Sequence, residues 1–128
     1  MTDMQNLDAL DDTTFRATVR AWIRAHYPED KRFPPKRPRR AENKFWYDML
    51  AAQGWIAPGW PREWGGMGLS GAKQIILHEE MEHHGCMRLN DMGLIMVGPL
   101  LLRHGTEAQK QRFLPRILSG EHIWCQGY

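Results

Sequence analysis

Apolar side chains recur at helical spacing along most of this chain, and a glycine or proline follows each run. Between residues 12 and 27 they lie three or four positions apart, which places them on one face of a helix. These residues are Phe15, Val19, Trp22, Ile23 and Tyr27. Asp11 or Asp12 can cap the start of this helix, and Pro28 ends it. The pattern predicts an amphipathic helix that buries one face against other helices.

Two more amphipathic helices are predicted downstream. Residues 41–53 have an apolar face, and Gly54 follows them as a C-terminal cap. Ser70 is a suitable N-cap for a helix that continues to Gly85. The glycine-rich sequence between these helices does not follow a strand, so it lacks the context of a phosphate-binding loop. Residues 58–70 are therefore predicted to form a turn that uses its glycines for backbone freedom.

Residues 90–104 are apolar nearly all round. Such a helix is expected to be buried by its neighbours. Pro99 should kink it, because proline lacks an amide donor and crowds the preceding turn. Thr106 and Gln109 then form a capping box at the start of a fifth helix, which ends before Gly120.

The composition is that of a globular protein. The chain has 128 residues, of which 42% are hydrophobic and 25% charged, and this length suits one domain. Its two cysteines are too few for a disulfide scaffold. The acidic amino terminus lacks the basic region of a signal peptide, and no apolar run approaches the length of about 20 residues that a membrane helix needs. We expect a cytoplasmic protein without a membrane segment.

The last eight residues, 121–128, have strand-like character but no partner strand. One short strand does not form a sheet alone. We therefore predict an all-α domain of about five helices over residues 1–120, cut from a longer protein.

A cluster of basic residues lies between the first two predicted helices. Residues 31–40 read KRFPPKRPRR, and their positive charge is compatible with a nucleic-acid-binding or interaction module. Three prolines prevent this segment from forming a helix, and no aromatic platform accompanies the charges. A solvated loop over residues 28–40 is the favoured interpretation, and the interaction module is the alternative.

Three segments together resemble the N-terminal helical domain of the flavin-dependent acyl-CoA dehydrogenases. They are GWIAPGWPREWGGMGLS (residues 54–70), HEEM (78–81) and GPLLLRHGTEAQKQRFLPRILSGEHIWCQGY (98–128). The most specific part is the capped helix of residues 104–121 leading into WCQGY. The resemblance covers nearly the whole chain and is weakest before Ala41. It implies that residues 121–128 form the first strand of a middle β-domain.

The resemblance also implies an activity for the parent protein. Members of this family use FAD to oxidise an acyl-CoA to a 2-enoyl-CoA, pass electrons to an electron-transferring flavoprotein, and assemble as dimers or tetramers. A glutamate of their C-terminal bundle removes the α-proton while a hydride leaves the β-carbon for the flavin. That bundle lies outside this chain, so the resemblance assigns no catalytic residue here. We expect an oxidoreductase that forms a homo-oligomer, and a 128-residue chain that is inactive and retains no FAD by itself.

Two residues near the end are candidates for flavin contact. Gln126 and Tyr128 lie one residue apart on the predicted strand and so face the same way. The resemblance implies that they contact the flavin. The alternative is an exposed strand end without a ligand.

The resemblance places the acyl-chain wall in the apolar region before Gly105. It implies that five residues contact the acyl group, namely Arg88, Leu89, Met92, Gly93 and Met96. The alternative is ordinary core packing of a methionine-rich helix. Glycine at position 93 indicates either a close helix contact or space kept open beside the acyl tail. Open space predicts that Gly93→Leu in the complete enzyme lowers kcat/KM for bulky acyl-CoAs more than for short ones.

A metal site is a weaker alternative from another class of protein. Residues 80–83 have the E-x-x-H spacing of di-iron helical bundles. Such a site needs a second copy of the motif and two further carboxylates, and the sequence has no second copy. We therefore predict no metal site, and expect Glu79, Glu80 and Glu82 on a solvated face or capping neighbouring groups.

Overall fold

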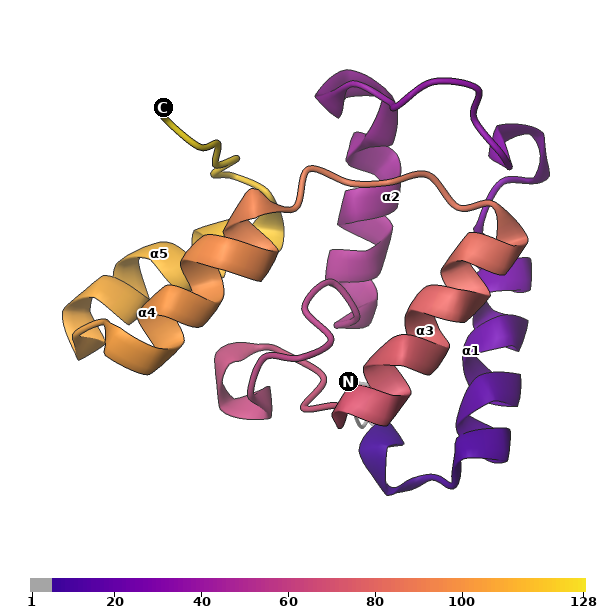
Figure 1. Ribbon diagram of the computed structural model, residues 1–128, viewed down its shortest axis with the longest axis horizontal. Coiled ribbons are helices and arrows are strands. Elements are labelled where there is room, and N and C mark those ends of the chain that lie inside the picture. Colours follow the sequence, from indigo (N-terminus) through magenta and orange to yellow (C-terminus); the bar gives the residue numbers. More distant parts are fainter. Residues whose placement is uncertain (1–5) are drawn as a thin grey trace.

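The computed structural model describes residues 6–128, and in that part of the chain all regular structure is helical (Figure 1). The five α-helices are α1 (Asp12–His26), α2 (Arg40–Gln53), α3 (Gly71–His84), α4 (Gly98–His104) and α5 (Glu107–Ser119). Short 3₁₀ turns occur at Leu7–Ala9, Glu29–Lys31 and Arg62–Trp64. The predicted all-α fold is confirmed.

The helix ends follow the capping signals in the sequence. The Asp11 side chain accepts a hydrogen bond from the Thr14 amide at 2.9 Å, which caps α1. Thr106 and Gln109 form the predicted capping box of α5, with bonds of 2.9 and 3.2 Å. Gly54 ends α2 in the left-handed conformation, with φ of 81°. These boundaries are local decisions, because each depends on backbone groups within one turn.

The helices form two groups with α2 between them (Figure 1). α1 packs along α3, and α4 pairs with α5 at the other end of the molecule. Apolar faces from both groups meet α2 in the core. The first helix thus buries its apolar face against other helices, as predicted. The most buried core side chains include Phe15, Val19, Ile23, Trp46, Tyr47, Leu77, Leu114 and Ile117.

The region predicted as one kinked helix is built differently. Gly93–Val97 form a π turn (η4), which leads directly into α4. Pro99 lies in the first turn of α4, directly after the π turn. The expectation that this helix is buried all round was wrong, since Ile95 is 60% exposed and Leu100 59% exposed. The reason is that the contacts of η4 and α4 with α5 and with Trp60 leave Ile95 and Leu100 outside the packed core.

Residues 121–128 extend beyond α5 and form neither helix nor strand. A strand needs a neighbouring strand for its hydrogen bonds, so the local sequence does not impose one here. The assignment of these residues to a following domain stays a prediction. Among residues 6–128, none of the helices has the length and hydropathy of a membrane span.

Candidate functional site

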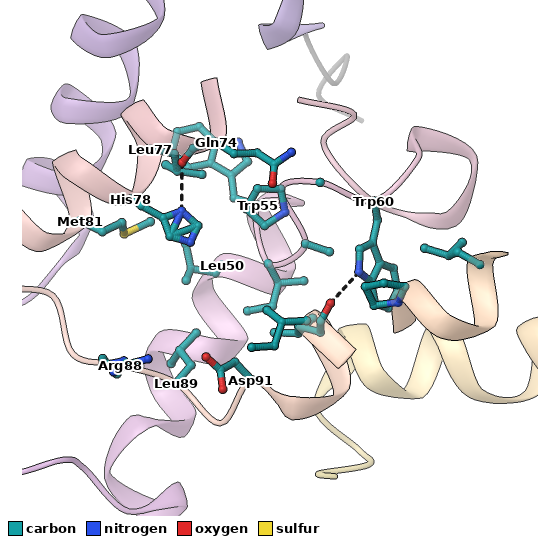
Figure 2. Close-up of a pocket in the computed structure, with 18 of the residues that line it drawn as sticks. Leu50, Trp55, Trp60, Gln74, Leu77, His78, Met81, Arg88, Leu89 and Asp91 are labelled. Atoms are coloured by element: carbon teal, nitrogen blue, oxygen red, sulfur yellow. Dashed lines mark hydrogen bonds between the residues drawn. The ribbon is translucent and has the colours of Figure 1, made fainter. Parts of the chain in front are cut away.

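A cleft of about 1300 Å³ lies between α3, the loop after α2, and the π turn with α4 (Figure 2). Much of its lining is apolar, including Leu50, Trp55, Leu77, Met81, Leu89 and Leu94. Polar side chains are present at fewer positions, including Gln74, His78, Glu82, Arg88 and Asp91. A concave surface with many apolar side chains and a few polar groups is typical of sites for organic ligands.

One wall of the cleft is the glycine-rich turn, which is folded around Trp60. A side chain at Gly66 would place its Cβ 2.1 Å from the Trp60 carbonyl oxygen, so only glycine permits this approach. The Gly68 amide donates a hydrogen bond of 2.9 Å to the same oxygen. Trp60 is 3% exposed as a result. The predicted turn is confirmed, and its function in the fold is to hold a buried tryptophan.

The facing wall is the π turn, and Trp60 bonds to it. The Trp60 indole Nε1 donates a hydrogen bond of 2.9 Å to the Leu94 carbonyl (Figure 2). A Cβ at Gly98 would lie 2.0 Å from Cζ2 of the same indole, so glycine is required there for the ring to approach the helix. The sequence analysis missed this contact. Its signal was the Gly98-Pro99 pair inside an apolar helix.

The polar groups of the cleft are partly committed to local bonds. The His78 Nδ1 donates to the Gln74 carbonyl at 3.0 Å in the tautomer that this oxygen requires. The side-chain amide of Gln74 donates a hydrogen bond to the Leu69 carbonyl at 3.0 Å. Cys86 also lines the cleft, and burial raises the pKa of its thiol to about 12. Because the thiol stays protonated, Cys86 is a poor nucleophile.

The five predicted acyl-wall residues separate into two groups. Arg88 and Leu89 line the cleft, whereas Met92, Gly93 and Met96 are not part of its lining. Contact of any of these residues with an acyl group stays a prediction.

Gly93 is a position of close helix packing. A Cβ there would lie 3.0 Å from Ile117 Cγ2 and 3.0 Å from Trp124 Cδ1. Both neighbours are side chains of this chain, so the described residues leave no open space beside Gly93. Of the two explanations that the sequence left open for this glycine, the structure shows the close contact.

The two predicted flavin-contacting residues are exposed and bond to each other. The Tyr128 hydroxyl donates to Gln126 Oε1 at 2.7 Å. The side-chain amide of Gln126 donates to the Met96 sulfur at 3.4 Å. Both side chains could offer hydrogen bonds, but no described wall encloses a flavin ring beside them. A cofactor of that size needs such enclosure. The described residues do not form a flavin site on their own, and flavin contacts by Gln126 and Tyr128 stay a prediction.

Glu80 contradicts the expectation of a solvated acidic face. Its side chain is 4% exposed and accepts hydrogen bonds from Arg16 and Arg20 on α1. These bonds lower the pKa of the Glu80 carboxyl to about 2, and the hydrogen bond from Arg20 has the largest effect. Both carboxylate oxygens are therefore committed to arginines. The structure finds no cluster of candidate metal ligands among residues 6–128.

Two arginines of the basic segment bond to groups of this chain. Arg32 bonds to Glu29 at 2.6 Å and to the His84 carbonyl at 2.8 Å. Arg40 begins α2 and donates to the Gly120 carbonyl at 3.1 Å. Apart from the turn Glu29–Lys31, the segment from residue 28 to 39 is irregular, as predicted. Part of its charge thus serves the fold.

Comparison with known proteins agrees with this architecture. The sequence model of the family described as "Acyl-CoA dehydrogenase, N-terminal domain" matches residues 10–121. The chain therefore belongs to the acyl-CoA dehydrogenase family and represents its N-terminal domain.

Two curated relatives are similar to this chain over about nine tenths of its length. Acyl-CoA dehydrogenase IpdE1 of Mycolicibacterium smegmatis is 38% identical over 122 residues, which cover 89% of this chain and 31% of the relative. IpdE1 of Mycobacterium tuberculosis is 37% identical, with coverage of 92% and 33%. The chain thus spans about a third of the length of these curated relatives.

Two solved structures share the fold. One is described as "Tcur3481-Tcur3483 steroid ACAD", with a TM-score of 0.69 and 32% identity over 87% of this chain and 29% of that one. The other is the ChsE4-ChsE5 complex from Mycobacterium tuberculosis, with a TM-score of 0.65 and 28% identity over 88% of this chain and 29% of that one.

Proposed function

We propose that this chain is the N-terminal part of an FAD-dependent enzyme that oxidises an acyl-CoA to a 2-enoyl-CoA, and that its cleft forms one wall of the acyl-binding pocket. The observation that carries the proposal is the cleft of about 1300 Å³ with many apolar side chains, in a domain of the acyl-CoA dehydrogenase family. Leu89 and Arg88 are the two predicted acyl-wall residues that line it.

The acyl group in this proposal is bulky. Clefts for small organic ligands usually have volumes of about 300 to 1000 Å³, so this one suits more than a straight chain. One solved relative is described as a steroid ACAD, which supports a CoA thioester of a steroid-derived acid as substrate.

The remaining parts of the proposed enzyme lie outside this chain. FAD and the catalytic base would be held by other parts of the parent protein, with Gln126 and Tyr128 at the edge of the flavin site. Electrons would pass to an electron-transferring flavoprotein. A homo-oligomer is the expected assembly, and one solved relative is described as a complex of two named proteins, which supports pairing with a second chain.

The residues of this chain contribute binding and the exclusion of water. Trp55, Leu77 and Leu89 would contact the apolar part of the acyl group and remove it from solvent. No step of proton or hydride transfer is assigned to a described residue. The protonated Cys86 thiol is compatible with an inert wall.

The experiment is to express the full-length parent and measure dehydrogenation of two acyl-CoA probes. The probes are octanoyl-CoA and the CoA thioester of a steroid carboxylic acid, with a dye as electron acceptor. Leu89→Trp, which fills part of the cleft, should reduce kcat/KM for the steroid thioester at least about tenfold more than for octanoyl-CoA.

Ile75→Trp is the matched control. Ile75 lies on α3, is exposed, and is not part of the cleft lining, so its replacement should leave both rates unchanged. A full-length flavoprotein that forms no 2-enoyl-CoA from either probe would contradict the proposed activity. Equal effects of the two tryptophan variants would contradict the assignment of the cleft.

A further inference from the structure

We infer that Trp60 is a positioning residue for the acyl cleft, because its indole N–H holds the π turn that forms the facing wall. The inference rests on the proposed function for its consequence in catalysis. Its structural basis is independent of that function, since it depends on hydrogen bonds within this chain.

The carbonyl of Leu94 has no donor from its own helix. In an α-helix it would accept from the amide of residue 98, four positions later. The Gly98 amide bonds instead to the Gly93 carbonyl, five positions back, which is the π pattern. Continuing that pattern, Leu94 would accept from residue 99, but Pro99 has no amide hydrogen. The indole of Trp60 supplies the missing donor at 2.9 Å.

The π turn decides which side chains face the cleft. It contains one residue more than an α-helical turn, so the side chains after it are rotated by about 100° relative to an uninterrupted helix. Leu94, Ile95 and Leu100 line the cleft in this arrangement. Leu94 and Ile95 lie within the turn and Leu100 follows it, so the orientation of all three toward the cleft depends on the turn being maintained.

Trp60 is fixed on both sides. Its backbone is enclosed by the glycine-rich turn, where the Gly68 amide bonds to its carbonyl. Its ring lies against the bare backbone of Gly98. The hydrogen bond to Leu94 is buried, so no solvent donor replaces the indole when it is removed. A single buried donor thus links the loop wall to the helix wall.

The test uses the full-length parent protein and three variants. Trp60→Phe removes the N–H and keeps an aromatic ring. It should lower the ratio of kcat/KM for the steroid thioester to kcat/KM for octanoyl-CoA at least about tenfold, mainly through KM for the steroid thioester. Trp64→Phe is the matched control, because Trp64 lies in the same turn, stacks under Lys110 and is outside the cleft lining. It should leave the ratio within twofold of the wild-type value.

The rescue variant is Trp60→Phe combined with Pro99→Ala, compared with Pro99→Ala alone. An alanine at position 99 supplies an amide that can bond to Leu94, so the double variant should recover most of the lost ratio. A ratio unchanged by Trp60→Phe, an equal loss in Trp64→Phe, or a loss that Pro99→Ala does not repair would each overturn the inference.

A crystal structure of the wild-type parent gives an independent result. Trp60 Nε1 within hydrogen-bonding distance of the Leu94 oxygen, with the π turn present, supports the inference even where Trp60→Phe does not fold. A regular α-helix at Gly93–Val97 overturns it. A wild-type flavoprotein that oxidises neither probe would contradict the proposed function. The crystal-structure test of the Trp60–Leu94 hydrogen bond would still apply.

Discussion

Arg20 makes two hydrogen bonds to Glu80, from Nε to Oε2 and from Nη2 to Oε1, each 2.8 Å long. Arg16 adds a third bond to Oε1 at 2.9 Å. The Arg20–Glu80 pair, whose members are 60 residues apart in the sequence, links α1 to α3. Because Glu80 is nearly inaccessible to solvent, these bonds replace the water that an exposed carboxylate would have.

Replacing Glu80 should destabilise the protein. Glu80→Gln removes the negative charge and should lower the free energy of unfolding by about 1 to 2 kcal/mol, below the range for a fully buried pair because both arginines are partly exposed. Urea unfolding at neutral pH measures this difference. The control is Glu79→Gln, since Glu79 is half exposed and, among residues 6–128, bonds to Arg16 alone. Equal effects of the two variants would show that the buried carboxylate has no special contribution.

The contribution of Glu80 should disappear in acid. Its pKa in the folded protein is about 2, below the ordinary value of 4.5, so the ionised form stabilises the fold. The stabilisation is fully present above pH 4.5 and is lost as the pH falls toward 2. The difference in unfolding free energy between the wild type and Glu80→Gln should therefore shrink through this range. A difference that stays constant down to pH 2 would contradict the assigned pKa.

Tyr47→Phe should cost about 1 kcal/mol of unfolding free energy, near the typical net value of one hydrogen bond. The Tyr47 hydroxyl donates to the buried Ile117 carbonyl, which joins α2 to α5. The loss stays modest because the Gly120 amide also bonds to that carbonyl. Thermal unfolding measures the effect. Tyr128→Phe is the control, since the Tyr128 side chain is fully exposed, and a similar loss there would contradict the explanation.

Gly93→Leu should lower stability by about 1 to 3 kcal/mol, the usual cost of inserting side-chain atoms into a packed contact. The new side chain would meet Ile117 and Trp124 at close distance. In the full-length enzyme, kcat/KM for short and bulky acyl-CoAs should fall by similar factors, unlike the selective loss expected from the sequence. Gly71→Leu is the control, because nothing lies within 4 Å of a Cβ there. A selective loss without a lower melting temperature would restore the acyl-tail interpretation.

The isolated 128-residue chain should not retain FAD. Gln126 and Tyr128 are exposed, and the described residues build no wall around a flavin. The measurement is the visible absorbance of the purified chain after incubation with FAD and gel filtration. The full-length parent serves as the positive control. A yellow chain with one flavin per molecule would contradict this expectation.

The sequence by itself determined the local structure of this protein. Helix periodicity, the caps at Asp11 and Thr106, and the glycine after α2 each depend on groups within one or two turns, so they can be inferred from neighbouring residues. The motifs of residues 54–70 and 98–128 were also sufficient for the family, because they combine several such local signals.

Only the tertiary structure decided which residues form the cleft and which polar groups are buried. From the sequence, Glu80 is expected on the surface, but in the fold Arg16 and Arg20 lie against it and it is buried. Pro99 reads as a helix kink until Trp60 supplies a donor to Leu94 from a loop 34 residues away. Gly93 could equally have marked open space until Ile117 and Trp124 were placed beside it. In each case the partner is distant in the chain, and its position depends on how the helices pack, which local propensity does not encode.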